Sequence, residues 1–154
     1  MAVTADGRRA LSGGADGTVR WWDLAAGRCL RTFTDHGEAV SAVAVTPDGR
    51  HAVSGGTGGA VCAWNLAAGT CGRLPVHHTA QINSVAISAD GRHALSGGED
   101  TTLRWWDLEE GRCLHQVKTA YVASAAMTPD AHHAVSGMAD GSLLLWEIAW
   151  DYAF

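Results

Sequence analysis

The chain repeats one twelve-residue pattern four times, and this repetition limits the folds it can adopt more than any other feature. The pattern reads SGGADGTVRWWD at residues 12–23, SGGTGGAVCAWN at 54–65, SGGEDTTLRWWD at 96–107 and SGMADGSLLLWE at 136–147. The copies start 42, 42 and 40 residues apart. A fixed period of this size predicts a repeat architecture, in which each copy forms one small unit and buries apolar surface against its neighbours.

Each copy is expected to form four short strands. Examples are VSAVAV (40–45), HAVSGG (51–56), TLRWWD (102–107) and RCLRTF (28–33). The third is β-branched and aromatic, as strands prefer, and turns such as PDG and LEEG separate the strands. The glycine pair that closes the second strand is expected to adopt backbone angles that other residues avoid. Hairpin-linked strands predict one antiparallel sheet per copy, and apolar residues on both faces predict that the sheets stack against one another.

Composition and charge agree with a folded domain and exclude two classes of partner. The chain has 154 residues, enough for one sizeable core, and its 19 Gly are accompanied by 7 Trp and many aliphatic residues. The net charge of −5 argues against a nucleic-acid or anionic-membrane surface, since both need clustered positive charge. We expect no membrane span and no signal peptide, because no apolar run approaches the required length of about 20 residues.

The cysteines follow the repeat rather than a disulfide framework. Cys29, Cys71 and Cys113 recur at the 42-residue period, each after Gly-Arg or Gly-Thr, so each occupies the same place in a different copy. Equivalent positions in separate units are expected to be packing positions. The sequence therefore predicts free thiols, a reducing compartment and a cytoplasmic location.

Two further motifs identify the repeat. The copies end in Trp22-Asp23, Trp64-Asn65, Trp106-Asp107 and Trp146-Glu147, and their turns are Asp6-Gly7, Asp48-Gly49, Asp90-Gly91 and Asp130-Ala131. This pattern resembles the WD-repeat β-propeller family over essentially the whole chain. The resemblance implies an all-β fold of four WD-type, four-stranded antiparallel blades, at about residues 1–36, 37–78, 79–118 and 119–154. The ending LLLWEIAWDYAF also resembles the last blades of large bacterial multidomain WD-repeat proteins.

The resemblance implies a role for the serine of each copy. In this family a His, a Ser, an Asp and a Trp of one blade form a buried hydrogen-bond network, and the third copy has all four in His78, Ser96, Asp100 and Trp106. A nucleophilic triad would occur once, whereas this constellation is attempted in every copy. We therefore expect Ser96 to be structural, and we expect neither a catalytic residue nor enzymatic activity.

The other copies lack one member each. The matching residues are His36, Ser54 and Trp64 in the second copy, Ser12, Asp16 and Trp22 in the first, and Ser136, Asp140 and Trp146 in the fourth. Gly58 replaces the Asp of the second copy, Lys118 stands where the fourth copy needs a His, and the first copy begins too late to supply one. Blade three is expected to be the most rigid, and replacing Gly58 with Asp is expected to be neutral or stabilising.

Other candidate sites are weaker. His51, His93, His132 and His133 recur just after the turns on separate blades, so we expect them not to converge on a metal ion. The glycine-rich SGGTGGA lacks the Lys-Ser/Thr of a phosphate-binding loop. Trp21 and Trp105 are expected to pack between blades. The sequence thus predicts no cofactor and no metal.

Closure of the propeller is the main open question. Propellers have about 4 to 8 blades, and WD-type wedges resemble those that close at seven or eight, so four should leave an open arc with exposed apolar faces. Either two chains close one eight-bladed ring as a homodimer, or the chain is a piece of a longer propeller; a self-closed four-blade ring is the third alternative. The aromatic residues of the tail, Trp150, Tyr152 and Phe154, are expected to lie on the outermost strand of blade four.

The function expected by analogy with the family is a non-enzymatic protein–protein interaction scaffold. The candidate partner-binding residues lie near the loops that precede the inner strands and in adjacent hairpins: Glu38, Thr57, Gln81, Glu99 and Tyr121. The alternative is a purely architectural module that binds only another copy of itself.

Overall fold

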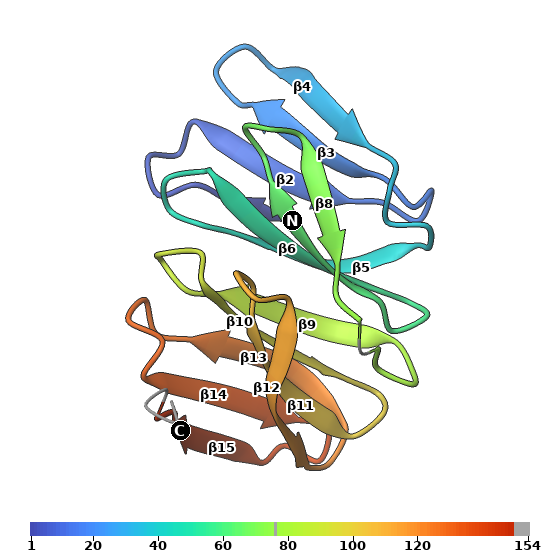
Figure 1. Ribbon diagram of the computed structural model, residues 1–154, viewed down its shortest axis with the longest axis vertical. Coiled ribbons are helices and arrows are strands. Elements are labelled where there is room, and N and C mark those ends of the chain that lie inside the picture. Colours follow the sequence, from blue (N-terminus) through green and yellow to red (C-terminus); the bar gives the residue numbers. More distant parts are fainter. Residues whose placement is uncertain (76, 150–154) are drawn as a thin grey trace.

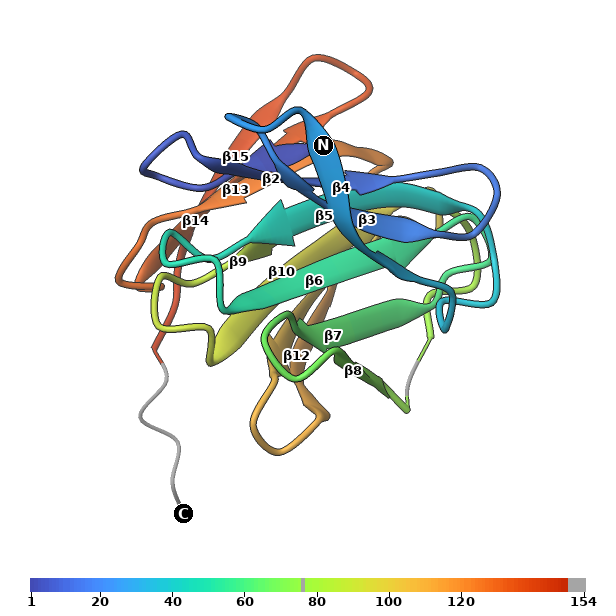
Figure 2. The ribbon, with the colours of Figure 1, turned by 90° about the horizontal axis from the view of Figure 1, so that it is seen from above.

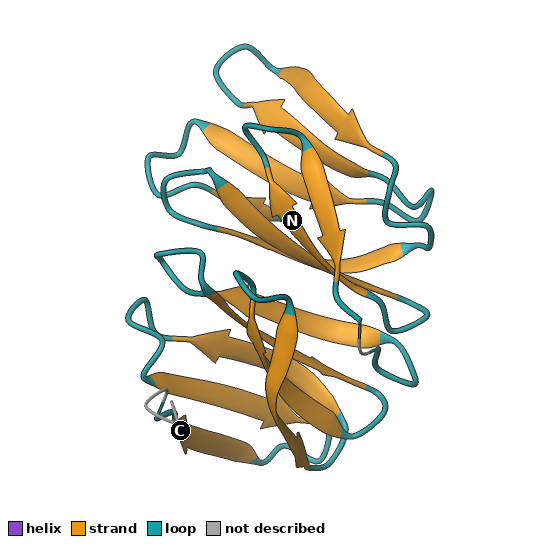
Figure 3. Ribbon diagram, viewed as in Figure 1, coloured by secondary structure: helices purple, strands orange, loops and turns teal. Residues whose placement is uncertain are grey.

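The computed structural model describes residues 1–75 and 77–149, and in these ranges it consists of strands and turns without a helix (Figure 3). The strands are β1 (Ala2–Val3), β2 (Arg9–Gly13), β3 (Val19–Asp23), β4 (Arg28–Phe33), β5 (Val40–Val45), β6 (His51–Gly56), β7 (Val61–Asn65), β8 (Thr70–Arg73), β9 (Ile82–Ile87), β10 (His93–Gly98), β11 (Thr102–Asp107), β12 (Arg112–Lys118), β13 (Val122–Met127), β14 (His133–Met138) and β15 (Leu143–Glu147). No helix long and apolar enough to cross a membrane occurs among the described residues.

Consecutive strands pair antiparallel and form four sheets. Their orders are β1-β2-β3-β4, β5-β6-β7-β8, β9-β10-β11-β12 and, within the described residues, β13-β14-β15. The prediction of an all-β chain with one antiparallel sheet per repeat is confirmed. The sheets follow one another in chain order along the longest axis, with the first and the fourth at opposite ends (Figure 1). The predicted outer strand of the fourth sheet falls on residues 150–154, which lie outside the described residues.

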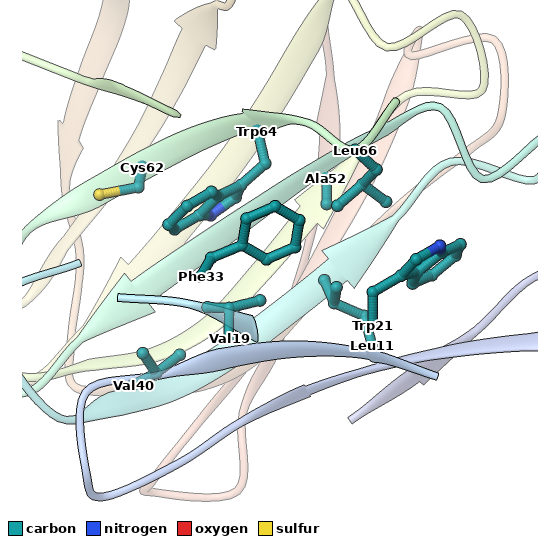
Figure 4. Packing of buried hydrophobic residues seen from close by; sticks show 9 residues of the cluster. All are labelled: Leu11, Val19, Trp21, Phe33, Val40, Ala52, Cys62, Trp64 and Leu66. Carbon is teal, nitrogen blue, oxygen red and sulfur yellow. The ribbon is translucent and has the colours of Figure 1, made fainter. Parts of the chain in front are cut away.

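The hydrophobic core lies between neighbouring sheets rather than within one of them. Trp21 and Phe33 of the first sheet pack with Trp64 and Leu66 of the second, and the rings of Phe33 and Trp64 have centroids 5.2 Å apart (Figure 4). Two further clusters join the second sheet to the third and the third to the fourth. Figure 2 shows the same sheets overlapping one another when seen from above.

Both tryptophans expected to pack between blades do so. Trp21 belongs to the cluster between the first two sheets, and Trp105 packs edge-to-face on Trp146 of the next sheet, with ring centroids 5.5 Å apart. Such aromatic pairs add to the stabilisation gained from burying their large apolar surfaces.

The glycine pairs at the ends of the second strands do not have the unusual backbone angles that the sequence led us to expect. Positive φ occurs instead in turns, for example at Gly49 (φ 69°). The strand glycines make room for the next sheet. A Cβ added at Gly55 would lie 2.5 Å from Ile82 Cγ2, and one added at Gly97 would lie 2.5 Å from Val122 Cγ1. The first glycine of each of these pairs is therefore required by the close approach of the next sheet, not by backbone strain, whereas a Cβ at Gly56 or Gly98 would meet Glu38 or Gln81 of its own blade.

Replacing Gly97 with Ala should lower the free energy of unfolding by about 1–2 kcal/mol, because the new methyl overlaps the stiff, β-branched Val122 and forces the sheets apart. The matched control is Gly137→Ala. Gly137 occupies the equivalent position in the fourth sheet, where an added Cβ meets nothing within 4 Å. Urea unfolding of the two variants should show a loss for the first alone; equal losses would contradict this account of the glycines.

Candidate functional site

The four network residues of the third sheet are brought together by four different segments. His78 precedes β9, Ser96 lies in β10, Asp100 lies in the β10–β11 hairpin, and Trp106 lies in β11. His78 Nε2 is 2.7 Å from Ser96 Oγ, and Trp106 Nε1 donates to the same oxygen at 2.8 Å. His78 Nδ1 is 2.9 Å from Asp100 Oδ2. The network therefore ties the loop before the inner strand to the second and third strands.

The structure adds Thr102 to this network, which the sequence reasoning missed. Its hydroxyl donates to Asp100 Oδ1 at 2.8 Å, and its backbone N–H donates to the same atom at 3.0 Å. Arg104 Nη2 lies 3.7 Å from Asp100 Oδ2, and both of these side chains are buried. The hydroxyl at this position is visible in the first, third and fourth copies, at residues 18, 102 and 142, and is the signal that could have revealed it.

The partners of the imidazole define its protonation. Nδ1–H donates to the Asp100 carboxylate, so Nε2 is the acceptor for the Ser96 hydroxyl, and Ser96 Oγ in turn accepts from Trp106. Burial lowers the pKa of His78 and outweighs Asp100, which raises it. Burial alone would raise the pKa of Asp100, but the bonds from His78 and Thr102 outweigh that effect and hold it below its usual value.

The arrangement has the distances of a Ser-His-Asp triad but not its access. Ser96 has no exposed surface, His78 is 2% exposed, and the serine oxygen already accepts the indole N–H. A nucleophile needs a free path to a substrate carbon. What these groups can do is satisfy one another in a low-dielectric interior, which rigidifies the sheet.

The stability of the protein should fall as the pH drops below about 6.5. An unfolded His78 takes up a proton near that pH, whereas the folded one, with its lowered pKa, stays neutral. The unfolded state then binds more protons, so acid favours it. Below about pH 4 the lowered pKa of Asp100 adds a loss of the same sign. Urea titrations between about pH 7.5 and 5.5 should show this loss in the parent chain and a smaller one in His78→Gln; identical pH dependence would contradict it.

The second sheet does not complete the predicted network. Ser54 Oγ accepts from Trp64 Nε1 at 2.8 Å, but His36, although fully buried, has no hydrogen-bond partner at either ring nitrogen. The prediction that His36 is linked to Ser54 is wrong. The physical reason is the missing carboxylate at Gly58, without which nothing orients the ring.

Glu38 supplies a carboxylate in the place of the missing Asp. Its Oε1 accepts from the backbone N–H of Gly58 and of Ala60, each at 3.0 Å. Asp100 Oδ1 accepts from the N–H of Thr102, the residue equivalent to Ala60, also at 3.0 Å. Glu38, expected to bind a partner, is thus engaged in closing the β6–β7 hairpin.

Because Glu38 takes the place of the aspartate, Gly58→Asp should not be neutral or stabilising, as the sequence led us to expect, but destabilising. A Cβ at Gly58 would clash with Glu38 Oε2, and an Asp would add a second carboxylate beside the first. Gly58→Asp alone should therefore cost about 1–2 kcal/mol. In a Glu38→Ala background the same change should restore stability, because the new Asp replaces the lost acceptor. A double-mutant cycle measures this coupling; additive effects would contradict it.

The first and fourth sheets keep only the Ser–Trp part of the network within the described residues. Trp22 Nε1 donates to Ser12 Oγ at 2.9 Å, and Trp146 Nε1 donates to Ser136 Oγ at 2.8 Å. Their aspartates close the hairpin turns instead. Asp16 accepts from the N–H of Thr18 at 3.1 Å, and Asp140 accepts from the N–H of Ser142 at 2.8 Å. Lys118, where a His was needed, ends strand β12.

The remaining predicted partner-binding residues lie in the hairpins and loops at one end of the strands. Thr57 is exposed in the β6–β7 hairpin. Gln81 precedes β9 and donates to the side chain of Asn83 at 3.3 Å. Tyr121 Oη donates to Glu99 Oε1 at 2.9 Å, which links the third sheet to the fourth at the surface. Of these residues, the structure brings Glu99 together with Tyr121 and also with Gln81, whose carbonyl accepts from the backbone N–H of Glu99 at 2.9 Å.

The fourth sheet exposes apolar residues on a face that is buried in the other three sheets. Val19, Val61 and Leu103 have no exposed surface, because each packs toward the following sheet, whereas the equivalent Leu143 is 70% exposed. Its neighbour Leu145 is 76% exposed. The sequence of the fourth sheet thus retains residues suited to packing against a further sheet.

The first sheet shows the complementary exposure at the other end. Leu66 is 4% exposed because it packs against the first sheet, whereas the equivalent Leu24 is 46% exposed. Val3 of β1 is 53% exposed. The molecule therefore carries two apolar end faces, one formed by the first sheet and one by the fourth.

No three His, Cys, Asp or Glu side chains of the described residues are arranged to hold a metal ion. His51, His93 and His133 begin strands of three different sheets.

Stacked antiparallel sheets, each closed by a Trp–Ser hydrogen bond, define a repeat protein built from propeller-type blades. The chain belongs to the WD40 family: the family model described as WD domain, G-beta repeat, matches residues 1–23, 27–65, 69–107 and 111–147. The resemblance inferred from the Trp-Asp and Asp-Gly motifs is confirmed. A comparison with curated proteins found no match.

The matched segments are offset by one strand from the sheets. The match at residues 27–65 begins with β4, the outer strand of the first sheet, and ends with β7 of the second. The second, third and fourth matches therefore each span two neighbouring blades, whereas the first, residues 1–23, lies within blade one.

Proposed function

We propose that this chain is a protein-interaction scaffold whose four blades form half of a closed ring, completed by a second copy. WD40 repeats generally mediate protein–protein interactions and scaffolding, and this general role is what the family membership supports. The finer proposal, self-association into an eight-bladed ring, rests on the two apolar end faces.

The observation that carries the proposal is the exposure of Leu143. The same position is fully buried in the other three blades by the blade that follows. A blade that retains Leu143 and Leu145 on this face is equipped to pack against one more blade. The face of blade one that carries Leu24 is equivalent to the face of blade two that carries Leu66 and packs against blade one.

The internal contact between blades one and two indicates how the two end faces would meet. There, Trp21 and Leu66 share one cluster. By equivalence, Leu145 of one copy would lie against Leu24 of the other. Full burial of an aliphatic side chain stabilises by about 1.5–3 kcal/mol, so several such residues on each of two interfaces favour a permanent assembly. A head-to-tail contact closes into a ring when the rotations sum to one turn, and two copies supply eight blades.

The ring would hold its loops in fixed positions for a partner. Glu99 and Tyr121 lie on the edge where loops precede the inner strands, and both are exposed. The alternative is an architectural module with no ligand beyond its own copy, which the same end faces would also support. In either case we propose a cytoplasmic location, in keeping with the free thiols of all four cysteines.

Co-expression of two differently tagged copies tests the assembly. Purification through one tag should also recover the other copy, in mixed pairs that form beside pairs of like copies, and recovery of one tag alone would contradict self-association. The scaffold and the architectural module are then distinguished by saturable binding of a second protein species to the purified pair, and by its loss in Tyr121→Ala.

A further inference from the structure

In the second blade a thiol occupies the position at which blades one and three have the arginine of an ion pair. In blades one and three an arginine of the third strand pairs with the hairpin aspartate, with 2.6 Å between Arg20 and Asp16 and 3.7 Å between Arg104 and Asp100. At the equivalent positions blade two has Cys62 and Gly58. Both charges are absent, and a buried cysteine occupies the position of the arginine.

A second cysteine lies beside the first on the same face of the sheet. Along β7 and β8, Cys62 is opposite Arg73 and Trp64 is opposite Cys71, so the two cysteines are diagonal neighbours. The corresponding ladders of blades one and three shift register beside the tryptophan, whereas that of blade two is continuous. Cys113 in blade three donates to its own strand, at His115 O, 3.3 Å away. In blade two Cys71 packs against the cluster that contains Cys62.

The surroundings of the pair favour one thiolate. Cys62 has no exposed surface, Cys71 is partly exposed, and the buried imidazole of His36 has no hydrogen-bond partner. Arg73 donates through Nη2 to the backbone carbonyl of His36, which places the positive charge of its guanidinium beside His36. The Cys71 thiol, followed by His36 and Arg73, lowers the pKa of Cys62 to about 5 against the opposing effect of burial. The pKa of Cys71 is raised, because its proton is held by Cys62 and a second negative charge is disfavoured.

We propose that Cys62 and Cys71 are a redox modification site, at which peroxide converts the two thiols into a reversible disulfide across β7 and β8. Cys62 is reached by peroxide when the exposed edge strand β8 moves aside; its thiolate then attacks one oxygen of hydrogen peroxide, the O–O bond breaks, and a sulfenic acid and hydroxide form. The Cys71 sulfur then attacks the Cys62 sulfur, the S–O bond breaks, and water leaves. The two thiols lose two electrons and two protons, and one peroxide becomes two waters.

The fold allows β8, the strand that carries Cys71, to move. β8 is the outermost strand of its sheet, and Thr70, Gly72 and Arg73 on it are exposed. A disulfide requires the Cβ atoms of its two cysteines to lie close together. Drawing Cys71 toward Cys62 to meet this requirement shifts the edge strand β8 rather than the interior of the blade. The site is independent of ring closure, since both cysteines belong to one blade.

Peptide mapping of the intact protein after brief peroxide treatment tests the proposal. Cys62 and Cys71 lie in one tryptic peptide, residues 51–73, which should lose the mass of two hydrogen atoms and regain it with dithiothreitol. This conversion should be about tenfold or more faster than oxidation of Cys113, whose pKa burial raises. In Cys71→Ser, Cys62 should instead be trapped by dimedone as its sulfenic acid, while Cys113→Ser should leave the conversion unchanged.

The proposal is overturned if the peptide gains oxygen without losing hydrogen, or if the four cysteines react at equal rates. It is also overturned if only intermolecular disulfides through the exposed Cys29 form. Because the parent protein gives these readouts, a variant that fails to fold does not prevent the test.

Discussion

A chain carrying Leu143→Glu and Leu145→Glu should remain folded but lose its ability to pair. In the proposed ring both leucines are buried against blade one of the other copy, so the variant would have to bury two unpaired carboxylates. We expect the dissociation constant to rise by at least about a thousandfold. Sedimentation velocity should show a single monomeric species for the variant under conditions where the parent chain sediments as a dimer.

The matched control carries the same added charge away from the end faces. Thr57 and Ala68 are exposed in turns of blade two, so Thr57→Glu with Ala68→Glu should leave the dimer intact. If this control also dissociates the pair, general charge repulsion rather than the apolar face is responsible. If the Leu143 and Leu145 double variant still pairs, the interface lies elsewhere.

Replacing Ser96 with Ala should have the largest effect on stability of any single change in the network. Ser96 Oγ accepts from Trp106 Nε1 and the Ser96 O–H donates to His78 Nε2, and both of these partners are buried. The variant leaves two buried polar atoms unpaired, which should cost about 3 kcal/mol. Urea unfolding at fixed protein concentration measures the loss.

Ser12→Ala is the comparison for this change. Ser12 makes the equivalent bond to Trp22, which is only half-buried and has no histidine in its network. Water can replace the lost bond there, so the loss should be about 1 kcal/mol or less. Equal losses in the two blades would show that the histidine contributes nothing.

The blade-three network could be predicted from the sequence because its members occupy fixed places in a recurring motif. The role of Glu38 could not, because its carboxylate reaches the β6–β7 hairpin from the preceding loop, and a position-by-position comparison of the copies shows only that Gly58 is not Asp. The same limit applies to His36. Its ring is unpaired because no carboxylate is present at residue 58, and the position of His36 in the motif does not show this.

The strand glycines illustrate a second limit. Their residue type indicated special backbone angles, whereas the structure shows that Gly55 and Gly97 leave room for Ile82 and Val122 of the following sheets. Glycine has two uses, positive φ and close approach, and only the packing of neighbouring units separates them. Likewise, the pairing of Cys62 with Cys71 depends on the continuous β7–β8 register, which the spacing of the cysteines does not reveal.

The solution mass of the unmodified chain tests the account most directly. Multi-angle light scattering at low micromolar concentration should give a mass near twice the 16.1 kDa of one chain, because two copies are needed to bury the end faces that carry Leu24 and Leu143. A stable monomer near 16.1 kDa at that concentration would contradict the proposed ring.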